Sequence, residues 1–194
     1  EPHQPAFALM VVDLDRLKPI NDHHGHEGGD RVLVGVAEIL RHLCRESDTV
    51  VRWGGDEFVV LCDAGSLDSA AALAERIRST VSKQIFRVGE GAVARSSCSI
   101  GFATHPFIAS APERFGWEQS LALADLALYQ AKALRNDWVG WSGSASADTL
   151  PDLLQSIERD PAPLEEGGFI QVRRRPDPST DDSTGRWRHM PGSA

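Results

Sequence analysis

The sequence has few cysteines, and none of its three forms a CxxC pair. Cys44, Cys62 and Cys98 lie far apart and are odd in number, which argues against a disulfide framework. Cys62 and Cys98 occur in apolar, strand-like runs, where buried thiols are expected. Such a pattern fits a protein of a reducing compartment.

Long apolar runs are also absent. No stretch approaches the roughly 20 apolar residues that a membrane-spanning helix requires, and no signal peptide opens the chain. We therefore expect a cytoplasmic location, with a membrane anchor left open for the full-length protein. Because Glu1 is not a methionine, an upstream segment is expected.

Two further absences narrow the function. The net charge of -8 gives no general attraction for a polyphosphate chain, so we expect no nucleic-acid polymer as a partner. The chain also lacks a GxxxxGK(S/T) loop, which excludes P-loop nucleotide chemistry. A local basic site for a nucleotide remains compatible with this charge.

Composition divides the chain into a domain and a tail. Residues 1–141 carry the regular apolar patterns, whereas residues 142–194 are rich in Ser, Gly, Ala, Asp and Pro. We predict a largely disordered tail, in which the pattern allows one short helix around residues 150–157. The run Arg173-Arg174-Arg175 is interpreted as solvated charge, with contact to an acidic partner as the alternative.

The apolar patterns of residues 1–141 predict an α+β fold. Strand-like runs occur at residues 7–12, 49–53, 57–62, 97–103 and 138–141, and helical spacing occurs within residues 33–43, 70–81 and 121–131. A polar, glycine-bearing loop is expected between the first strand and the first helix. The order predicts a ferredoxin-like, palm-type sandwich, a mostly antiparallel sheet with its helices on one face.

Acidic residues follow two of the predicted strands. Asp13 and Asp15 end the first strand, and Asp56 and Glu57 lie in the hairpin after two glycines. If the strands are neighbours, Asp13 and Asp56 can converge on one magnesium ion, which prefers oxygen ligands. The glycines would allow a nucleotide to approach the backbone closely. The alternative is an acidic hairpin turn beside a solvated strand end.

Several spaced motifs then resemble one protein family. Residues 52–58 read RWGGDEF, residues 13–30 read DLDRLKPINDHHGHEGGD, residues 99–103 read SIGFA, and residues 124–132 read ADLALYQAK. Together these motifs are similar to those of the GGDEF domains of diguanylate cyclases, over roughly residues 7–141.

The resemblance implies an activity and its partners. Such an enzyme condenses two GTP molecules into cyclic di-GMP and two pyrophosphates, with magnesium, or manganese in its place, as cofactor. It implies a homodimer in catalysis, cyclic di-GMP as both product and inhibitor, and an upstream sensory module in the full-length protein.

The resemblance also implies residue roles. The implied metal ligands are Asp13, the Leu14 carbonyl and Asp56, and the implied catalytic residues are Asp56, Glu57 and Lys18. The implied guanine-binding segment contains Asn21, His26 and Asp30. The implied phosphate-binding pair is Lys132 and Arg135. An Asn and an Asp together can supply donors and acceptors for a guanine edge.

Arg45 and Asp48 form an RxxD sequence just before the GGDEF string. It is similar to the inhibitory site of many family members, which binds cyclic di-GMP away from the active centre. The alternative is a helix-end pair, since positions three apart share a helix face.

The chain departs from the family pattern at three points. Leu17 replaces an aromatic residue, and the segment that precedes the first strand in the family, D-x-L-T-G-L-x-N-R, is absent. The K-x-x-G-R-N pattern also lacks its glycine, which would rotate Arg135 by about 100° relative to Lys132 if the helix continued.

These departures keep two other functions open. One is a catalytically weak domain that senses cyclic di-GMP or GTP. The other is a different palm-type nucleotidyl cyclase or polymerase domain with the same carboxylate geometry.

Overall fold

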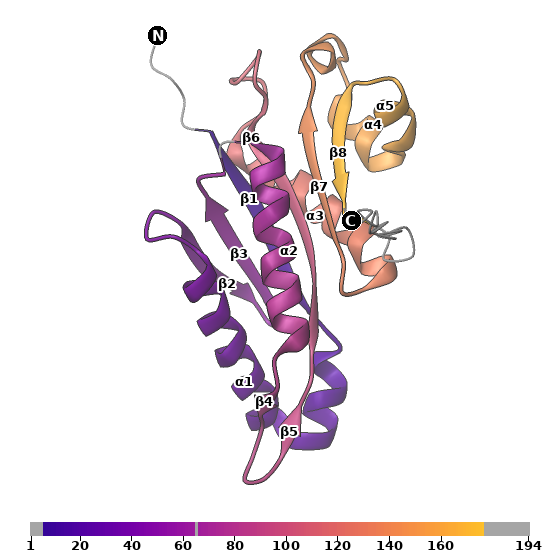
Figure 1. Ribbon diagram of the computed structural model, residues 1–194. Helices are drawn as coiled ribbons and strands as arrows, with labels where there is room; N and C mark the ends of the chain where they lie inside the picture. The colour runs from indigo at the N-terminus through magenta and orange to yellow at the C-terminus, as the bar shows by residue number, and fades with distance from the viewer. Residues whose placement is uncertain (1–5, 65, 177–194) are drawn as a thin grey trace, which may run out of the picture.

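The apolar runs of the sequence assemble into one mixed sheet with helices packed against it (Figure 1). The computed structural model describes residues 6–64 and 66–176. The main sheet contains β1 (Phe7–Asp15), β2 (Thr49–Gly54), β3 (Glu57–Cys62), β6 (Ser97–Ile108), β7 (Trp138–Gly143) and β8 (Ile170–Arg174). The helices are α1 (Leu17–Leu43), α2 (Leu67–Lys83), α3 (Trp117–Leu134), α4 (Leu153–Arg159) and α5 (Ala162–Glu166), with a short 3-10 helix at Ala145–Thr149. A small hairpin, β4 (Phe86–Arg87) and β5 (Val93–Ala94), lies between α2 and β6.

The strand order is β2-β3-β1-β6-β7-β8. Neighbouring strands pair antiparallel except β6 and β7, which are parallel. This arrangement confirms the predicted α+β class with a mostly antiparallel sheet. It also places β1, and with it the acidic end of that strand, in the middle of the sheet between β3 and β6.

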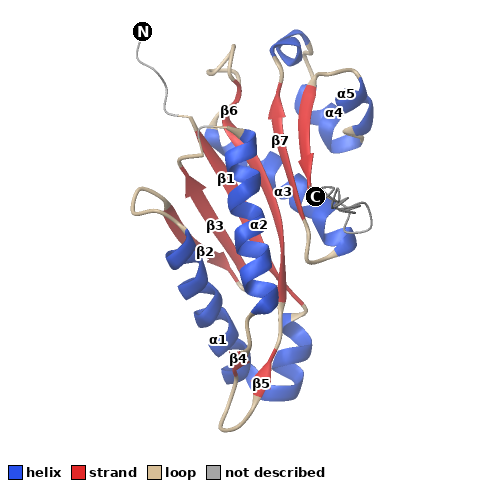
Figure 2. Cartoon of the chain, in the orientation of Figure 1, coloured by secondary structure: helices blue, strands red, loops and turns tan. Residues whose placement is uncertain are grey.

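Helices cover both faces of this sheet, whereas the sequence pattern predicted helices on one face only (Figures 1 and 2). Met10 and Val12 of β1 pack in a core with α1 and α2, while Leu9 and Val11 pack in a second core with α3. A strand buried on both sides has apolar residues at successive positions rather than at alternate ones. The continuous apolar run of β1 therefore required a helical layer on each face.

The segment predicted as a polar loop is helical. Helix α1 begins at Leu17 and bends at Gly25, whose backbone has φ 73° and ψ 171°. Leu17 and Ile20 are buried, but most of this first part of the helix faces solvent, which removed the apolar periodicity that predicts a helix. Within the part of the chain that the structure describes, no helix combines the length and apolar character needed to cross a membrane.

Residues 142–176 are folded, in contrast to the predicted disordered tail. Strand β8 pairs with β7 and extends the sheet, and Leu153, Ile157 and Leu164 of α4 and α5 join the core on the α3 side. Helix α4 overlaps the short helix that the pattern allowed around residues 150–157. The few apolar residues between the Pro and Asp clusters suffice because the edge of β7 and the face of α3 offer them partners. The rest of the predicted tail, residues 177–194, lies outside the described residues.

The arginine run of β8 and its flank is not simply solvated charge. Arg173 forms an ion pair with Asp68 on α2, and Arg174 forms one with Glu165 on α5. These pairs connect β8 to helices on both sides of the sheet. Exposed ion pairs each contribute little, so burial of the apolar residues remains the main source of stability for this segment.

Gly101 is where β6 and α3 approach most tightly. A Cβ at this position would collide with the Leu128 nitrogen and the Ala124 carbonyl oxygen of α3. We expect Gly101→Ala to lower the free energy of unfolding by about 3 kcal/mol, because helix backbone must move. Gly89→Ala is the control, since its Cβ would make only ordinary contact with Ala92. Urea unfolding measures both changes, and equal stability of the two variants would contradict the argument.

Candidate active site

The end of β1, the start of α1, the β2–β3 turn and the end of α3 enclose a cleft of about 620 Å³. The residues predicted for metal, phosphate or catalysis that line it are Asp13, Leu14, Lys18, Asp56, Lys132 and Arg135, whereas Glu57 is not among its lining residues. The structure therefore brings together residues that are far apart in sequence. Oxygen donors and cationic side chains share this space, which suits a phosphate group bound with a metal ion.

Asp13 is one of two buried acidic groups of the cleft, with Asp15, and 6% of its surface is exposed. Burial raises the pKa of its carboxyl to about 6, with a smaller upward effect from Asp56 and Glu57, while Lys132 opposes the rise. The Lys132 ammonium lies 2.8 Å from Asp13 Oδ2. Burial acts to lower the pKa of Lys132, but Asp13 outweighs it and the pKa is raised. Each group thus supports the charged form of the other.

The β2–β3 turn is held against the end of β1. The Leu14 amide donates to the Asp56 carbonyl at 3.1 Å, and Asp13 pairs in register with Glu57. Arg52 donates twice to the Gly55 carbonyl, at 3.2 and 2.8 Å, which closes the turn. Because the N–H and C=O of one strand residue point to the same side, the Leu14 carbonyl faces this turn as well.

These residues fit a magnesium or manganese ion. The Asp13 and Asp56 side chains and the Leu14 carbonyl supply oxygen donors, and all three residues line the cleft. Among residues 6–64 and 66–176, no group of three or more His, Cys, Asp or Glu side chains could hold a metal ion. Two carboxylates suit an ion that takes its remaining ligands from phosphate oxygens and water.

The predicted guanine-binding residues lie on α1 and do not line the same cleft. Asp30 is exposed and lines a separate hollow with Arg52 and Phe58. The Asn21 side chain packs against Gly29, where a Cβ would collide with its Oδ1. His26 is exposed. The structure therefore gathers Asp13 and Asp56 with the three predicted cationic residues, but Glu57, Asn21, His26 and Asp30 do not line this cleft.

Asp15 has a role that the sequence did not reveal. Its carboxylate accepts hydrogen bonds from Ser97 Oγ at 2.6 Å, Ser99 Oγ at 2.8 Å and the Asn136 amide at 2.9 Å. The Asp15 side chain thus joins β1 to β6 and to the turn after α3. The only sequence signal is the alternation of Asp13 with Asp15 on one face and of Ser97 with Ser99 on the neighbouring strand.

Arg135 lines the cleft because α3 ends just before it. The expected rotation of Arg135 away from Lys132 assumed a continuing helix, but α3 ends at Leu134. Arg135 has φ 59° and ψ 160°, a conformation that glycine usually adopts, and Asn136 follows with φ 47°. This turn, Arg135–Asn136, brings the arginine to the same cleft as Lys132.

Arg45 and Asp48 line a different hollow, of about 390 Å³, next to the end of α1. The Asp48 carboxylate accepts hydrogen bonds from the backbone amides of Arg45, at 2.7 Å, and Asp63, at 3.1 Å. Asp48 therefore also fixes the local backbone. Arg76 of α2 lines the same hollow. Sequence spacing gave no signal for Arg76, which reaches the site only through packing of α2 against α1.

Comparison with known proteins identifies relatives of this chain. The family model "Diguanylate cyclase, GGDEF domain" matches residues 1–137. The diguanylate cyclase DgcM of Escherichia coli K12 is 42% identical over 126 residues, which are 65% of this chain and 28% of DgcM. The chain therefore corresponds to less than a third of the length of that relative.

Solved structures give the same result. The GGDEF domain of TpbB from Pseudomonas aeruginosa is 38% identical, with a TM-score of 0.60 over 69% of this chain and 81% of that one. The GGDEF domain of DgcB from Caulobacter crescentus, solved in complex with c-di-GMP, is 28% identical, with a TM-score of 0.59 over 66% of this chain and 72% of that one. Its fold, its cleft and these matches show that the chain belongs to the GGDEF domain family of diguanylate cyclases.

Proposed function

We propose that this chain condenses two GTP molecules into cyclic di-GMP and two pyrophosphates. The observation that carries the proposal is the single cleft that Asp13 and Asp56 line together with Lys18, Lys132 and Arg135. Phosphoryl transfer depends mainly on positioning and on electrostatic stabilisation, and this cleft supplies both carboxylates and cations for a triphosphate.

The glycines of the β2–β3 turn support the same function. A Cβ at Gly54 or Gly55 would meet no atom of the described chain within 4 Å, and neither residue has a positive φ. Neither the packing nor the backbone conformation of this chain requires glycine there. A requirement for close approach by a nucleotide accounts for both residues.

In this proposal the residues have separate tasks. Asp13, Asp56 and the Leu14 carbonyl hold magnesium, or manganese, which supplies positive charge beside the phosphates. Lys18, Lys132 and Arg135 bind phosphate oxygens. Asn21 and Asp30, with His26 beside them, bind the guanine in a segment next to the cleft rather than inside it.

Two chains must meet for the reaction. The Asp56 and Glu57 carboxylates accept the proton of a 3′-hydroxyl, whose oxygen forms a bond to the α-phosphorus of the GTP on the partner chain. The bond from that phosphorus to the bridging oxygen breaks, and pyrophosphate leaves. A second, equivalent attack closes the ring. In the full-length protein an upstream sensory module is proposed to control this meeting.

A sensor function is the second candidate, and the Arg135–Asn136 turn favours it. Without the family glycine, the phosphate-binding arginine occupies a costly backbone conformation. Weaker GTP binding would follow. Binding of GTP or cyclic di-GMP without turnover is the result that would support the sensor over the cyclase.

The first prediction tests the acidic residues. Incubated with GTP and magnesium, the chain should yield cyclic di-GMP and pyrophosphate, measured by chromatography. Asp56→Asn should reduce the rate by at least about 100-fold, because a metal ligand and proton acceptor is lost. Asp125→Asn, an exposed carboxylate on α3, is the matched control and should keep the wild-type rate. Full turnover by Asp56→Asn would make the assignment wrong.

The second prediction concerns the pH dependence of stability without metal. Because the pKa of Asp13 is raised in the folded chain to about 6, the folded state binds this proton more tightly than the unfolded state. Protonated Asp13 therefore stabilises the folded state. This stabilisation is fully present below the ordinary pKa of an aspartate, 3.8, and is lost as the pH rises through about 6. In chelator, the unfolding free energy of the wild type should therefore fall by roughly 2–3 kcal/mol relative to Asp13→Asn between about pH 4 and 7. Parallel curves in urea unfolding would contradict the shift.

The third prediction concerns the hollow lined by Arg45 and Asp48. We propose that it binds cyclic di-GMP and inhibits the enzyme, because an arginine can contact a phosphate or a guanine edge in a bidentate manner. Inhibition, expressed relative to the uninhibited rate of each variant, should be lost in Arg45→Ala. It should be kept in Arg95→Ala, because Arg95 is exposed and does not line this hollow. Arg45 is the better target because Asp48 also holds two backbone amides. Equal inhibition of both variants by cyclic di-GMP would contradict the proposal that Arg45 belongs to an inhibitory site.

A further inference from the structure

The Arg135–Asn136 turn needs support from its surroundings. A non-glycine residue with the φ and ψ of Arg135 costs about 1–3 kcal/mol, so such a conformation persists only where neighbouring groups impose it. Asn136 tolerates its positive φ better, since asparagine enters the left-handed region more readily than most residues. The contacts that hold Asn136 therefore decide where Arg135 lies.

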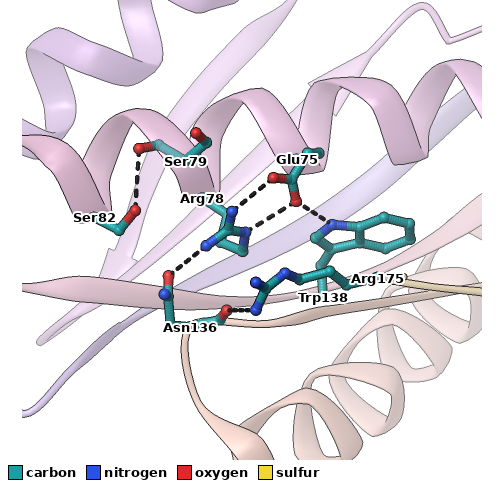
Figure 3. Close-up of polar contacts among 7 residues, drawn as sticks. All are labelled: Glu75, Arg78, Ser79, Ser82, Asn136, Trp138 and Arg175. Atoms are coloured by element: carbon teal, nitrogen blue, oxygen red, sulfur yellow. Dashed lines mark hydrogen bonds and ion pairs between the residues drawn. The ribbon is translucent and has the colours of Figure 1, made fainter. Parts of the chain in front are cut away.

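Three side chains from distant elements hold Asn136, and Figure 3 draws two of them, Arg78 and Arg175. The Asn136 amide donates to Asp15 Oδ2 at 2.9 Å, and its side-chain oxygen accepts from Arg78 Nη1 at 3.0 Å. Its carbonyl accepts from Arg175 Nη1 at 3.2 Å. Three of the four hydrogen-bonding groups of Asn136, its backbone amide, its side-chain oxygen and its carbonyl, are thus each bound by a different part of the chain.

The Arg78 contact is itself fixed. Glu75 accepts from the Arg78 guanidinium at 2.9 and 2.6 Å and from Trp138 Nε1 at 2.9 Å. Figure 3 shows this group between α2 and the start of β7. Arg78 and Asp15 belong to the part of the chain that matches the family, whereas Arg175 lies beyond residue 137, where that match ends.

Strand pairing delivers Arg175 to this turn. Val139 of β7 pairs with Arg174 of β8, and the Arg175 amide donates to the Trp138 carbonyl at 3.3 Å. The arginine therefore follows the last paired residue of β8, and its side chain reaches back to the carbonyl of Asn136. Arg173 and Arg174 point to other partners, Asp68 and Glu165.

We propose that Arg175 is a positioning residue for Arg135, which lines the cleft together with Lys132. Its hydrogen bond to the Asn136 carbonyl holds the strained turn, and the turn holds Arg135 beside Lys132. The folded C-terminal segment thereby stabilises a strained turn at the point where this chain lacks the glycine of the family pattern. This inference rests on the proposed function, because Arg135 matters as a group that binds GTP phosphates.

The kinetic test compares two neighbouring arginines in the full chain. Arg175→Ala should raise the KM for GTP about tenfold, with kcat changed less than about twofold, because the hydrogen bond that holds the turn carrying Arg135 is lost. Arg174→Ala is the matched control and should leave KM near the wild-type value, since its partner Glu165 belongs to the C-terminal segment. Arg175→Lys, which keeps a donor, should restore part of the affinity. Equal KM values for Arg175→Ala and Arg174→Ala would overturn the proposal.

A double-mutant cycle tests whether Arg175 acts through Arg135. In an Arg135→Ala background, Arg175→Ala should cause no further rise in KM, because the group that it positions is gone. Independent, additive effects of the two substitutions would show that Arg175 affects GTP binding by another route and would overturn the proposal.

Hydrogen exchange separates failure of this inference from failure of the proposed function. The Asn136 amide donates a hydrogen bond to Asp15. Without nucleotide, the hydrogen of this amide should exchange faster in Arg175→Ala than in Arg174→Ala. Absence of product from every variant would overturn the cyclase, while faster exchange would still support the role of Arg175 in holding the turn. Unchanged exchange would overturn that role whatever the activity.

Discussion

The buried carboxylate of Asp15 is the constraint on which the cleft depends. Only 7% of its surface is exposed, and it accepts hydrogen bonds from Ser97, Ser99 and the Asn136 amide. A buried charge is costly unless such partners are fixed, so the carboxylate ties together β1, β6 and the turn after α3. That junction sets the end of β1, where Asp13 faces Lys132, and the end of α3, which carries Lys132 and leads to Arg135.

Two groups of the cleft lower the stability of the fold, and in the proposed function both contribute to binding GTP with its metal ion. Burial raises the pKa of Asp13, the nearby Asp56 and Glu57 add to the rise, and Lys132 opposes it. Arg135, which lines the same cleft, adds backbone strain. Functional sites commonly retain such costs because the surrounding structure holds them in place. Here the supporting structure is the two-sided core and the C-terminal strand β8.

Hydrophobic patterns along the chain predicted much of the sheet. They failed for segments whose packing partners are distant in the sequence. Strand β3 has the predicted bounds, and the hairpin and the central helices were anticipated because their periodicity is local. The first part of α1 was predicted as a loop because few of its residues are buried. Residues 142–176 were predicted as disordered because their composition does not reveal that the β7 edge and the α3 face are available to them.

The sequence by itself determined that Asp13 ends a buried strand, that Asp56 and Glu57 lie in a hairpin, and that Lys132 lies near the end of a helix. Strand alternation, turn glycines and helical spacing are short-range properties, so they can be read along the chain. Only the tertiary structure decided that α3 stops before Arg135, that Asp15 holds Asn136, and that Arg175 reaches a carbonyl 39 residues away. Those outcomes depend on hydrogen bonds whose partners meet through sheet pairing, and no local periodicity encodes such partners.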